Sequence, residues 1–244
     1  MEETKTEFLK FMAGLGIKTY FIIPASAKDG VNISRRTPQM NWYKGPCLLE
    51  ALDSLRLNAK PAKNPLRFPI QDIYEIDGER IIVGKVLSGI IKPGQTITLF
   101  PSFQNTRISS IKVFGEVVKK ACAGENIELV LDESSSAKRG EVIAQKDDPP
   151  KPTHHFKGNI FWMSCEPLQI NKTITLRCST QEVKGIAEKI EKRINTSTLE
   201  ILEENAAELK INEAGVVVFK TEKPIIVEKF FFIEELGRFV IECE

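Results

Sequence analysis

The chain has 244 residues, of which 42% are hydrophobic, and its 34 basic and 33 acidic side chains leave a formal net charge of +1. Such a composition is ordinary for a soluble globular protein of one or two domains. It excludes a strong electrostatic footprint for nucleic acid or an anionic membrane over the whole chain, although a local basic patch stays compatible with it. Five cysteines form no Cys-x-x-Cys pair, and Glu2 and Glu3 stand where a secretory leader would be basic. We expect a cytoplasmic protein with reduced thiols and no membrane segment.

The first 57 residues have the rhythm of an α/β domain. Apolar side chains at helical spacing up to Leu15, with Thr4 and Glu7 at the spacing of a capping box, predict a first helix. The aromatic and β-branched run 19–23 predicts a buried strand, and a second helix is predicted to start with Pro46 in its first turn. One strand and two helices are too few for a doubly wound sheet. We therefore interpret residues 1–57 as the end of a larger domain.

Residues 64–146, after the polar linker 58–64, change to short strands at regular spacing. The turn Lys92–Gln95 has Pro and Gly at its central positions, as a type II turn requires. The pattern predicts a closed barrel of roughly 80 residues. Its predicted strands are Arg67–Tyr74, Arg80–Leu87, Thr96–Leu99, Arg107–Phe114 and Asn126–Leu131.

Residues 153–244, after the proline-rich linker Lys146–Pro152, are again rich in strands. The predicted strands are Asn159–Met163, Thr173–Cys178, Gly185–Ile194, Glu208–Ile211, Val216–Phe219 and Phe230–Ile233. Gly185–Ile194 also fits helical spacing and is assigned to a strand by its setting, whereas Thr198–Leu202 fits either a strand or a helical turn. The expected fold is mostly β, with two consecutive small antiparallel β-barrels preceded by a short α/β segment.

Two motifs in the first segment resemble parts of the translation-factor GTPases. Residues 21–33 (FIIPASAKDGVNI) follow the order of their last guanine-recognition loop, and residues 40–52 (MNWYKGPCLLEAL) resemble the helix that closes their GTP-binding (G) domain. The resemblance implies that Ser26, Ala27 and Lys28 form a residual guanine-base loop. In such loops a backbone N–H bonds the carbonyl oxygen of guanine, and short residues let the base lie close to the backbone.

The two predicted barrels resemble domains 2 and 3 of elongation factors of the Tu and 1A type. The domain 2 pattern appears at Pro65–Gln71, Gly84–Gly89, Lys92–Gly94, Ala123–Ile127 and Lys138–Ile143. Other motifs look closest to the large, GTP-binding subunit of bacterial sulfate adenylyltransferase. These are Leu66–Gln71, Leu99–Ser102, Phe161–Met163, Asn195–Glu200, Leu209–Gly215 and Gly237–Ile241.

The resemblance implies the C-terminal part of a GTPase like the sulfate adenylyltransferase large subunit. In that family the barrels couple GTP hydrolysis to adenylyl sulfate synthesis by a small catalytic ATP-sulfurylase subunit, which would be the partner. The alternative is a fragment of an elongation factor Tu/1A-like translation factor that binds aminoacyl-tRNA. A third hypothesis is an interaction protein that has discarded its GTPase.

The sequence contains no G-x-x-x-x-G-K-[ST] phosphate loop, no D-x-x-G switch motif and no N-K-x-D motif. We therefore expect this chain alone to bind neither GTP nor Mg²⁺ and to catalyse no reaction, with the G domain supplied in cis or in trans. Members of the family continue beyond the Gly237–Ile241 motif into a final strand. The resemblance thus implies that the last barrel lacks one strand and has an open edge.

Other residue groups favour structural interpretations. His154-His155 lack the spacing of metal ligands and are expected to be solvated, so no metal site is predicted. The paired glutamates 203–204 and 234–235 are expected on solvated faces. Trp162-Met163 and Phe230–Phe232 are predicted to lie in the barrel core. Arg35-Arg36 are expected to be a surface pair.

Overall fold

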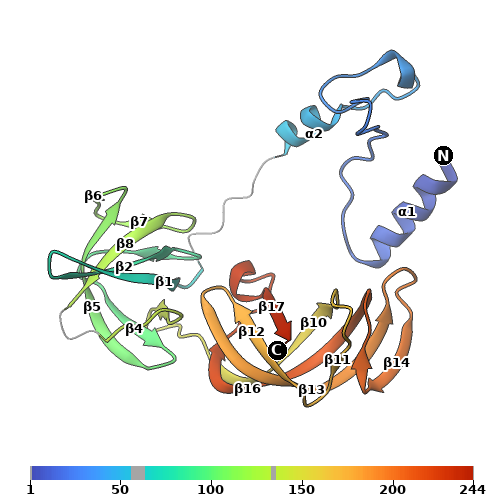
Figure 1. Ribbon diagram of the computed structural model, residues 1–244. Helices are drawn as coiled ribbons and strands as arrows, with labels where there is room; N and C mark the ends of the chain where they lie inside the picture. Colours follow the sequence, from blue (N-terminus) through green and yellow to red (C-terminus); the bar gives the residue numbers. More distant parts are fainter. Residues whose placement is uncertain (1, 56–63, 133–135, 244) are drawn as a thin grey trace. The chain divides into compact units, whose positions relative to one another are not determined.

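The computed structural model describes residues 2–55, 64–132 and 136–243. It divides into two compact units, Met1–Ala59 and Lys60–Glu244. The first unit holds α1 (Glu2–Gly14), a 3-10 turn (Pro38–Met40) and α2 (Leu48–Ser54), and the second holds the strands (Figure 1). The fold is mostly β, as the sequence predicts. The predicted linker 58–64 lies almost entirely outside the described residues.

Both predicted helices form, but their starts differ from the prediction. Helix α1 already includes Thr4 and Glu7 in its body, so these two residues do not cap it. Helix α2 has Cys47 as its N-cap, and the Glu50 carboxylate accepts a hydrogen bond from the Cys47 backbone N–H at 2.9 Å. Pro46 therefore precedes the helix instead of lying in its first turn.

The predicted strand at residues 19–23 does not form; this run carries no regular hydrogen bonding. A strand is held by backbone bonds to a neighbouring strand. Among the described residues of the first unit no strand lies beside this run. Its β-branched and aromatic residues favour an extended backbone, but a strand forms only when a neighbouring strand supplies hydrogen bonds.

The first barrel of the second unit is a closed ring of antiparallel strands. Its six strands are β1 (Arg67–Ile76), β2 (Glu79–Lys85), β4 (Thr96–Phe100), β5 (Gln104–Val113), β8 (Asn126–Leu131) and β9 (Val142–Ala144). Around the ring they follow the order β4, β9, β1, β2, β8, β5 and back to β4. The short strands are β3 (Ile90–Ile91), β6 (Glu116–Val117) and β7 (Ala121–Cys122). The predicted strands all lie in this ring, and β9 was missed because its three residues are all buried and show no alternation.

The predicted type II turn at Lys92–Gln95 is confirmed. Gly94 has φ 78°, and the Gln95 N–H donates to the Lys92 carbonyl at 3.3 Å. A positive φ at this position is what glycine adopts without steric cost. The turn brings β4 to the barrel wall, whose interior is filled by apolar side chains such as Phe68, Ile97 and Leu129.

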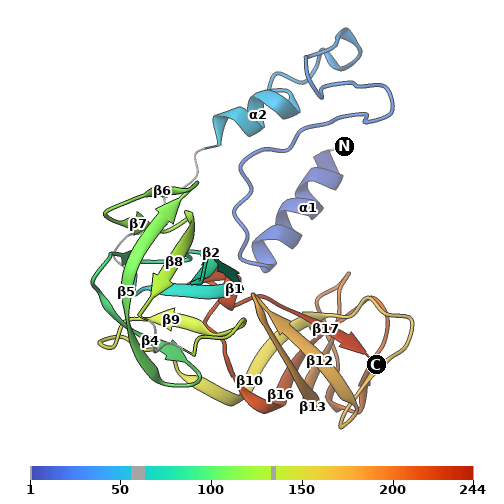
Figure 2. The same ribbon diagram turned by 60° about the vertical axis from the view of Figure 1, so that its left-hand side comes forward.

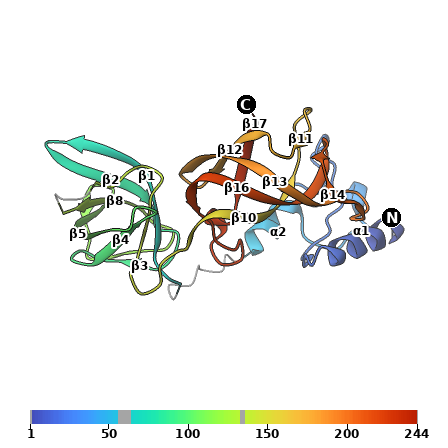
Figure 3. The ribbon, with the colours of Figure 1, turned by 90° about the horizontal axis from the view of Figure 1, so that it is seen from below.

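The second sheet also coils into a barrel (Figures 2 and 3). Its strands are β10 (Pro152–Phe161), β12 (Thr173–Cys178), β13 (Gln181–Asn195), β14 (Ile201–Ala206), β16 (Glu213–Ile226) and β17 (Phe239–Cys243). The path runs β10, β16, β13, β12, β17, with β14 beside β13, and the two-residue strands β11 (Leu168–Gln169) and β15 (Glu208–Leu209) form a separate pair. No described pairing joins β10 to β17. Among the described residues, β10 and β17 at the two ends of the path therefore each have one edge without a paired strand.

Three assignments in the second barrel are decided by the structure. Gly185–Ile194 is a strand, inside β13, and of the open segment Thr198–Leu202 the last two residues start β14. Phe230–Ile233 is not a strand, because the backbone N–H groups of Phe232 and Ile233 bond back to the Lys229 carbonyl at 2.8 and 3.1 Å. Local turn bonds thus override the β propensity of an aromatic run.

The two barrels share a small apolar core. It contains Leu87, Phe100, Val142 and Ala144 from the first barrel and Ile226, Ile233 and Leu236 from the second. Beside it, Arg67 of β1 is only 2% exposed and contacts Glu228 of the second barrel at 3.0 Å. Its guanidinium also donates to the Asp148 carbonyl in the linker at 2.9 Å. The linker and both barrels therefore meet at one buried arginine.

Candidate functional site

The predicted guanine-base loop is a tight turn closed on itself. Ser26 and Val31 exchange two backbone hydrogen bonds, at 3.2 and 3.0 Å, and the Ser26 hydroxyl donates to the Asp29 carboxylate at 2.8 Å. Ala27 and Lys28 are exposed at the tip of this turn, while Ser26 is half-buried. With the Ser26 hydroxyl engaged inside the loop, the tip offers a ligand its backbone N–H groups. A role of these three residues in guanine binding stays a prediction.

Asn32 stabilises this loop through two hydrogen bonds. It is 1% exposed and has φ 54°, and its side-chain amide donates to the Pro24 carbonyl at 2.9 Å. Its own carbonyl accepts the N–H of Leu48 at 3.0 Å, which fixes the loop to the start of α2. Asparagine tolerates the left-handed backbone region better than most residues. In the sequence, Asn32 stands out only as part of the motif at residues 21–33, and its supporting role is not visible there.

Metal-binding features are not found in the part of the chain that the structure describes: no group of three His, Cys, Asp or Glu is placed to hold an ion. His154 and His155 are exposed, and a ring nitrogen of His154 lies 3.0 Å from the Thr221 carbonyl oxygen. In the same described residues, neither α1 nor α2 has the length and apolar character of a membrane span.

The first barrel has a hollow of about 380 Å³ on its outer face, bounded by β1, β2, β5 and β8. Phe114, in the turn after β5, is 96% exposed at its rim, with Lys112 beside it. Gln71, Asn126 and Glu128 add polar groups to the wall. A flat aromatic face next to an ammonium group can stack on a planar ring and contact an anionic group nearby.

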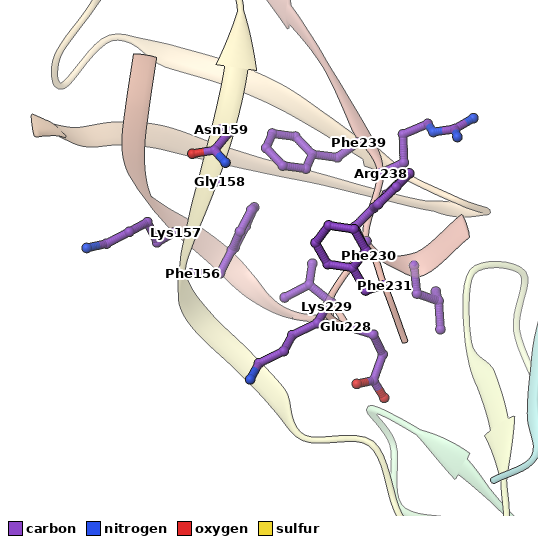
Figure 4. Close-up of a pocket in the computed structure, with 13 residues that line it drawn as sticks. Phe156, Lys157, Gly158, Asn159, Glu228, Lys229, Phe230, Phe231, Arg238 and Phe239 are labelled. Atoms are coloured by element: carbon purple, nitrogen blue, oxygen red, sulfur yellow. The ribbon is translucent and has the colours of Figure 1, made fainter. Parts of the chain in front are cut away.

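The second barrel has a larger groove, about 740 Å³, between β10 and the chain that leads into β17 (Figure 4). Its floor is formed by Phe156 and Phe239, whose ring centroids lie 5.3 Å apart and which both pack on the fully buried Phe219. Phe230 and Phe231 at its rim are 45% and 99% exposed. The prediction that Phe230–Phe232 fill the barrel core is therefore wrong.

A second hollow, of about 440 Å³, continues between β10 and β17. Trp162 at this end is 5% exposed, as predicted, and its indole N–H donates to the Glu166 carbonyl at 2.7 Å. Met163, which was predicted to be core with it, is 76% exposed. Successive side chains point to opposite faces of an extended chain, so only one residue of this pair faces the interior.

Three basic side chains, Lys157, Lys229 and Arg238, line this groove. Lys157 bonds the Glu191 carboxylate at 2.6 Å, and this hydrogen bond holds the pKa of Glu191 below its ordinary value. Arg238 forms an ion pair with Glu234. Lys229 has no ion-pair partner among the residues that the structure describes. Its ammonium is therefore the positive charge of the groove that is available to an anionic group.

Comparison with known protein families identifies the class of both barrels. Residues 79–144 match the family described as elongation factor Tu domain 2, and residues 155–243 match the family described as GTP-eEF1A C-terminal domain-like. The closed six-strand ring and the second coiled sheet agree with these matches. Together they support the predicted resemblance to the translation-factor-type GTPase family.

Sequence identities to individual relatives show which members of this group the chain resembles. The chain is 37% identical to elongation factor 1-alpha of Ignicoccus hospitalis over 95% of its length and 36% identical to that of Aeropyrum pernix, also over 95%. It is 29% identical to sulfate adenylyltransferase subunit 1 of Tolumonas auensis over 98%. It covers 54%, 54% and 51% of these relatives, so the chain spans about half the length of the proteins it matches.

A solved structure agrees on the fold. The crystal structure of sup35 complexed with GDP matches 91% of this chain and 55% of that one, with a TM-score of 0.72 and 22% sequence identity. The higher identity of the elongation factors favours the elongation-factor hypothesis. The short sequence motifs had favoured the sulfate adenylyltransferase hypothesis, so these identities reverse the ranking of the two hypotheses.

Proposed function

We propose that this chain is the barrel portion of an elongation factor 1-alpha-like translation factor and that its barrels bind aminoacyl-tRNA. The observation that carries the proposal is the 37% identity to an elongation factor 1-alpha across 95% of the chain. The matches of both barrels to elongation-factor domains support it. Net charge near zero means that such binding rests on local contacts.

Within this proposal, the hollow of the first barrel receives an unpaired nucleotide of the tRNA. Phe114 presents an almost fully exposed ring, on which a base can stack without regard to its identity. The Lys112 ammonium at the same rim then contacts the phosphate backbone. The polar groups of Gln71 and Asn126 are hydrogen-bonding partners for the edge of the base.

Residues 1–57 are proposed to be the end of a G domain, with Ser26, Ala27 and Lys28 as its last guanine contact. Residues 64–146 and 153–244 are proposed to be domains 2 and 3. GTP and Mg²⁺ would be held by a phosphate-loop-containing segment in cis or in trans, because this sequence carries no phosphate loop.

A titration of labelled aminoacyl-tRNA by filter binding over a range of salt concentrations tests the proposal. We expect saturable binding that weakens steeply with salt, because phosphate contacts release counterions. Phe114→Ala should weaken binding about tenfold, as loss of one base–aromatic stack does. Lys112→Ala should lower the salt slope by about 1.

Tyr74→Ala is the matched control, since Tyr74 is an exposed aromatic side chain of the same barrel, 50% exposed, outside the hollow. Binding should be unchanged in this variant. Equal effects of Phe114→Ala and Tyr74→Ala would refute the role of the hollow. Absence of any salt-dependent tRNA binding would refute the function.

The second candidate is a barrel module of a sulfate adenylyltransferase large subunit, which binds a small catalytic ATP-sulfurylase subunit. One observation favours it: the likeness to sulfate adenylyltransferase subunit 1 covers 98% of the chain. Co-purification with such a small subunit, without bound tRNA, would select this function. Copurifying tRNA and no small subunit would select the first.

A further inference from the structure

The hairpin formed by β1 and β2 carries apolar side chains on the face turned away from the barrel interior. Ile73 and Ile82 are cross-strand partners whose side chains pack in the barrel core. Successive side chains of a strand point to opposite faces, so Tyr74 and Ile76 point outward. They are 50% and 52% exposed. The tip of the hairpin extends beyond the other strands of this barrel (Figures 1 and 3), so a partner can reach these side chains.

Tyr74 and Ile76 belong to an apolar strip that crosses three strands, and Ile81 and Val130 complete it. Tyr74 lies opposite Ile81, and Ile81 lies opposite Val130 of β8. Ile81 is 8% exposed and Val130 half-buried, and neither belongs to the core of the barrel. The solvent face of an antiparallel sheet is usually polar, so the core does not account for this strip. Three strands about 4.8 Å apart make it about 10 Å wide, the diameter of an α-helix.

Carboxylates flank this outer strip. Asp72 and Glu79 occupy outward positions of β1 and β2, and Asp77 lies in the turn between the two strands. In the described part of the chain, none of these three carboxylates has an ion-pair partner. Arg80, the basic residue at the tip, lies on the other face of the hairpin, and its guanidinium donates to the Ala137 carbonyl. The margins of the strip are therefore negative, which favours a cationic partner.

We propose that the outer strip binds an amphipathic helix of a partner protein, and that the polar side of this helix is basic. Apolar side chains of the helix, at positions i, i+3, i+4 and i+7, cover Tyr74, Ile76 and Val130. Lysine or arginine side chains beside them reach the three flanking carboxylates. Burial of apolar surface drives the association, and the charges fix the orientation of the helix.

RNA and a second copy of the chain are poorer occupants of the strip. The flanking carboxylates repel the phosphates of RNA, whereas Lys112 of the same barrel lines the hollow. A two-fold interface joins one surface patch to the same patch of the other copy. It would bring the same carboxylates face to face without a cation between them. The charges therefore select a basic protein segment.

Fluorescence anisotropy with the whole chain and a labelled peptide of about four helical turns tests the proposal. The peptide carries leucine at helical spacing on one side and lysine at the remaining positions. A scrambled peptide of the same composition, with leucine on all sides of the helix, is its control. We expect saturable binding of the first peptide and at least about tenfold weaker binding of the second. Equal binding of the two would overturn the proposal.

Variants of the chain locate the site. Tyr74→Ala should weaken peptide binding about tenfold, because it removes the ring at the centre of the strip. Phe114→Ala is the matched control, since Phe114 is 96% exposed on the same barrel outside the strip, and should bind like the unchanged chain. Asp77→Asn with Glu79→Gln should weaken binding and its salt dependence, whereas Glu116→Gln, at an exposed carboxylate of β6, should not. The melting temperature checks that each variant folds. Equal effects of variants and controls would overturn the proposal.

Two further measurements identify the other occupants. Dimers in sedimentation that Tyr74→Ala abolishes would assign the strip to a second copy. Weaker aminoacyl-tRNA binding by Tyr74→Ala would assign it to RNA. Either result would overturn the inference. The inference does not depend on the proposed function, because peptide binding at the strip without any tRNA binding would refute that function alone.

Discussion

Arg67 and Glu228 stand 161 positions apart in sequence and form the charged contact beside the core that the two barrels share. The arginine is buried, and it donates to the Leu66 and Asp148 carbonyls as well as to the Glu228 carboxylate. Satisfied donors are what make a buried cation tolerable. At the scale of single residues, this side chain holds the barrels in one arrangement.

Arg67→Ala should lower the free energy of unfolding by about 3 kcal/mol, because it leaves the Glu228 carboxylate and two carbonyls without their partner. Arg177→Ala is the matched control: Arg177 forms ion pairs with Glu182 and Glu242 but is 49% exposed, so its loss should cost less than about 1 kcal/mol. Urea denaturation measures both. Similar losses in the two variants would contradict the role given to Arg67.

Cys178 is the second prediction at this scale. Burial raises the pKa of its thiol to about 12, because the thiolate is poorly solvated there. Only the thiolate is nucleophilic, so Cys178 should resist alkylation from pH 7 to 9, whereas exposed Cys165 should react. Peptide mapping after iodoacetamide treatment checks this. Rapid labelling of Cys178 in the folded chain would show that its site opens.

At the scale of elements, close strand contacts depend on glycines. A Cβ at Gly185 of β13 would collide with the carbonyl oxygen of Lys220 in β16 and lie 3.1 Å from the Thr221 Cα. The obstacle is backbone, which cannot rotate away. The long β13–β16 pairing therefore requires a residue without a side chain at this position.

Gly185→Ala should destabilise the second barrel by about 2 kcal/mol, in the range of overpacked cores. Lys189→Ala, at an exposed position of the same strand, serves as the control and should change stability by less than about 0.5 kcal/mol. Thermal unfolding followed by Trp162 fluorescence, in a Trp42→Phe background, measures the difference. A Gly185→Ala variant as stable as the control would mean that β13 and β16 are less closely packed.

At the scale of the whole molecule, the second unit is expected to unfold as one. Leu236 of the second barrel is fully buried in the core that it shares with Phe100 and Val142 of the first. Packing across the barrels couples their stabilities, because neither face can separate without exposing apolar surface.

Leu236→Ala should lower the free energy of unfolding by about 3 kcal/mol, because it leaves a cavity in the shared core. Both barrels should be destabilised together. In a Trp42→Phe background, Trp162 emission reports the second barrel, and hydrogen exchange of β8 amides reports the first. Val117→Ala, 71% exposed, is the neutral control. Loss of stability in only one barrel would show that they unfold independently.

Local patterns in the sequence predicted the mostly β fold, most of the strands of both barrels and the type II turn at Lys92–Gln95. These features depend on alternation and on the backbone preferences of a few residues, which are properties of short segments. The motif of the guanine loop also identified Ser26, Ala27 and Lys28 as one turn. Its supporting residue, Asn32, became visible only with its hydrogen bonds.

What the sequence by itself determined is thus the class of fold and the approximate positions of its strands. Only the tertiary structure decided that the first ring closes, that no described strand pairing joins β10 to β17, and that Phe230–Phe232 lie exposed in a loop. The physical reason is that ring closure and the Arg67–Glu228 contact join segments far apart in the chain. Their energies depend on pairing and burial that no local pattern encodes.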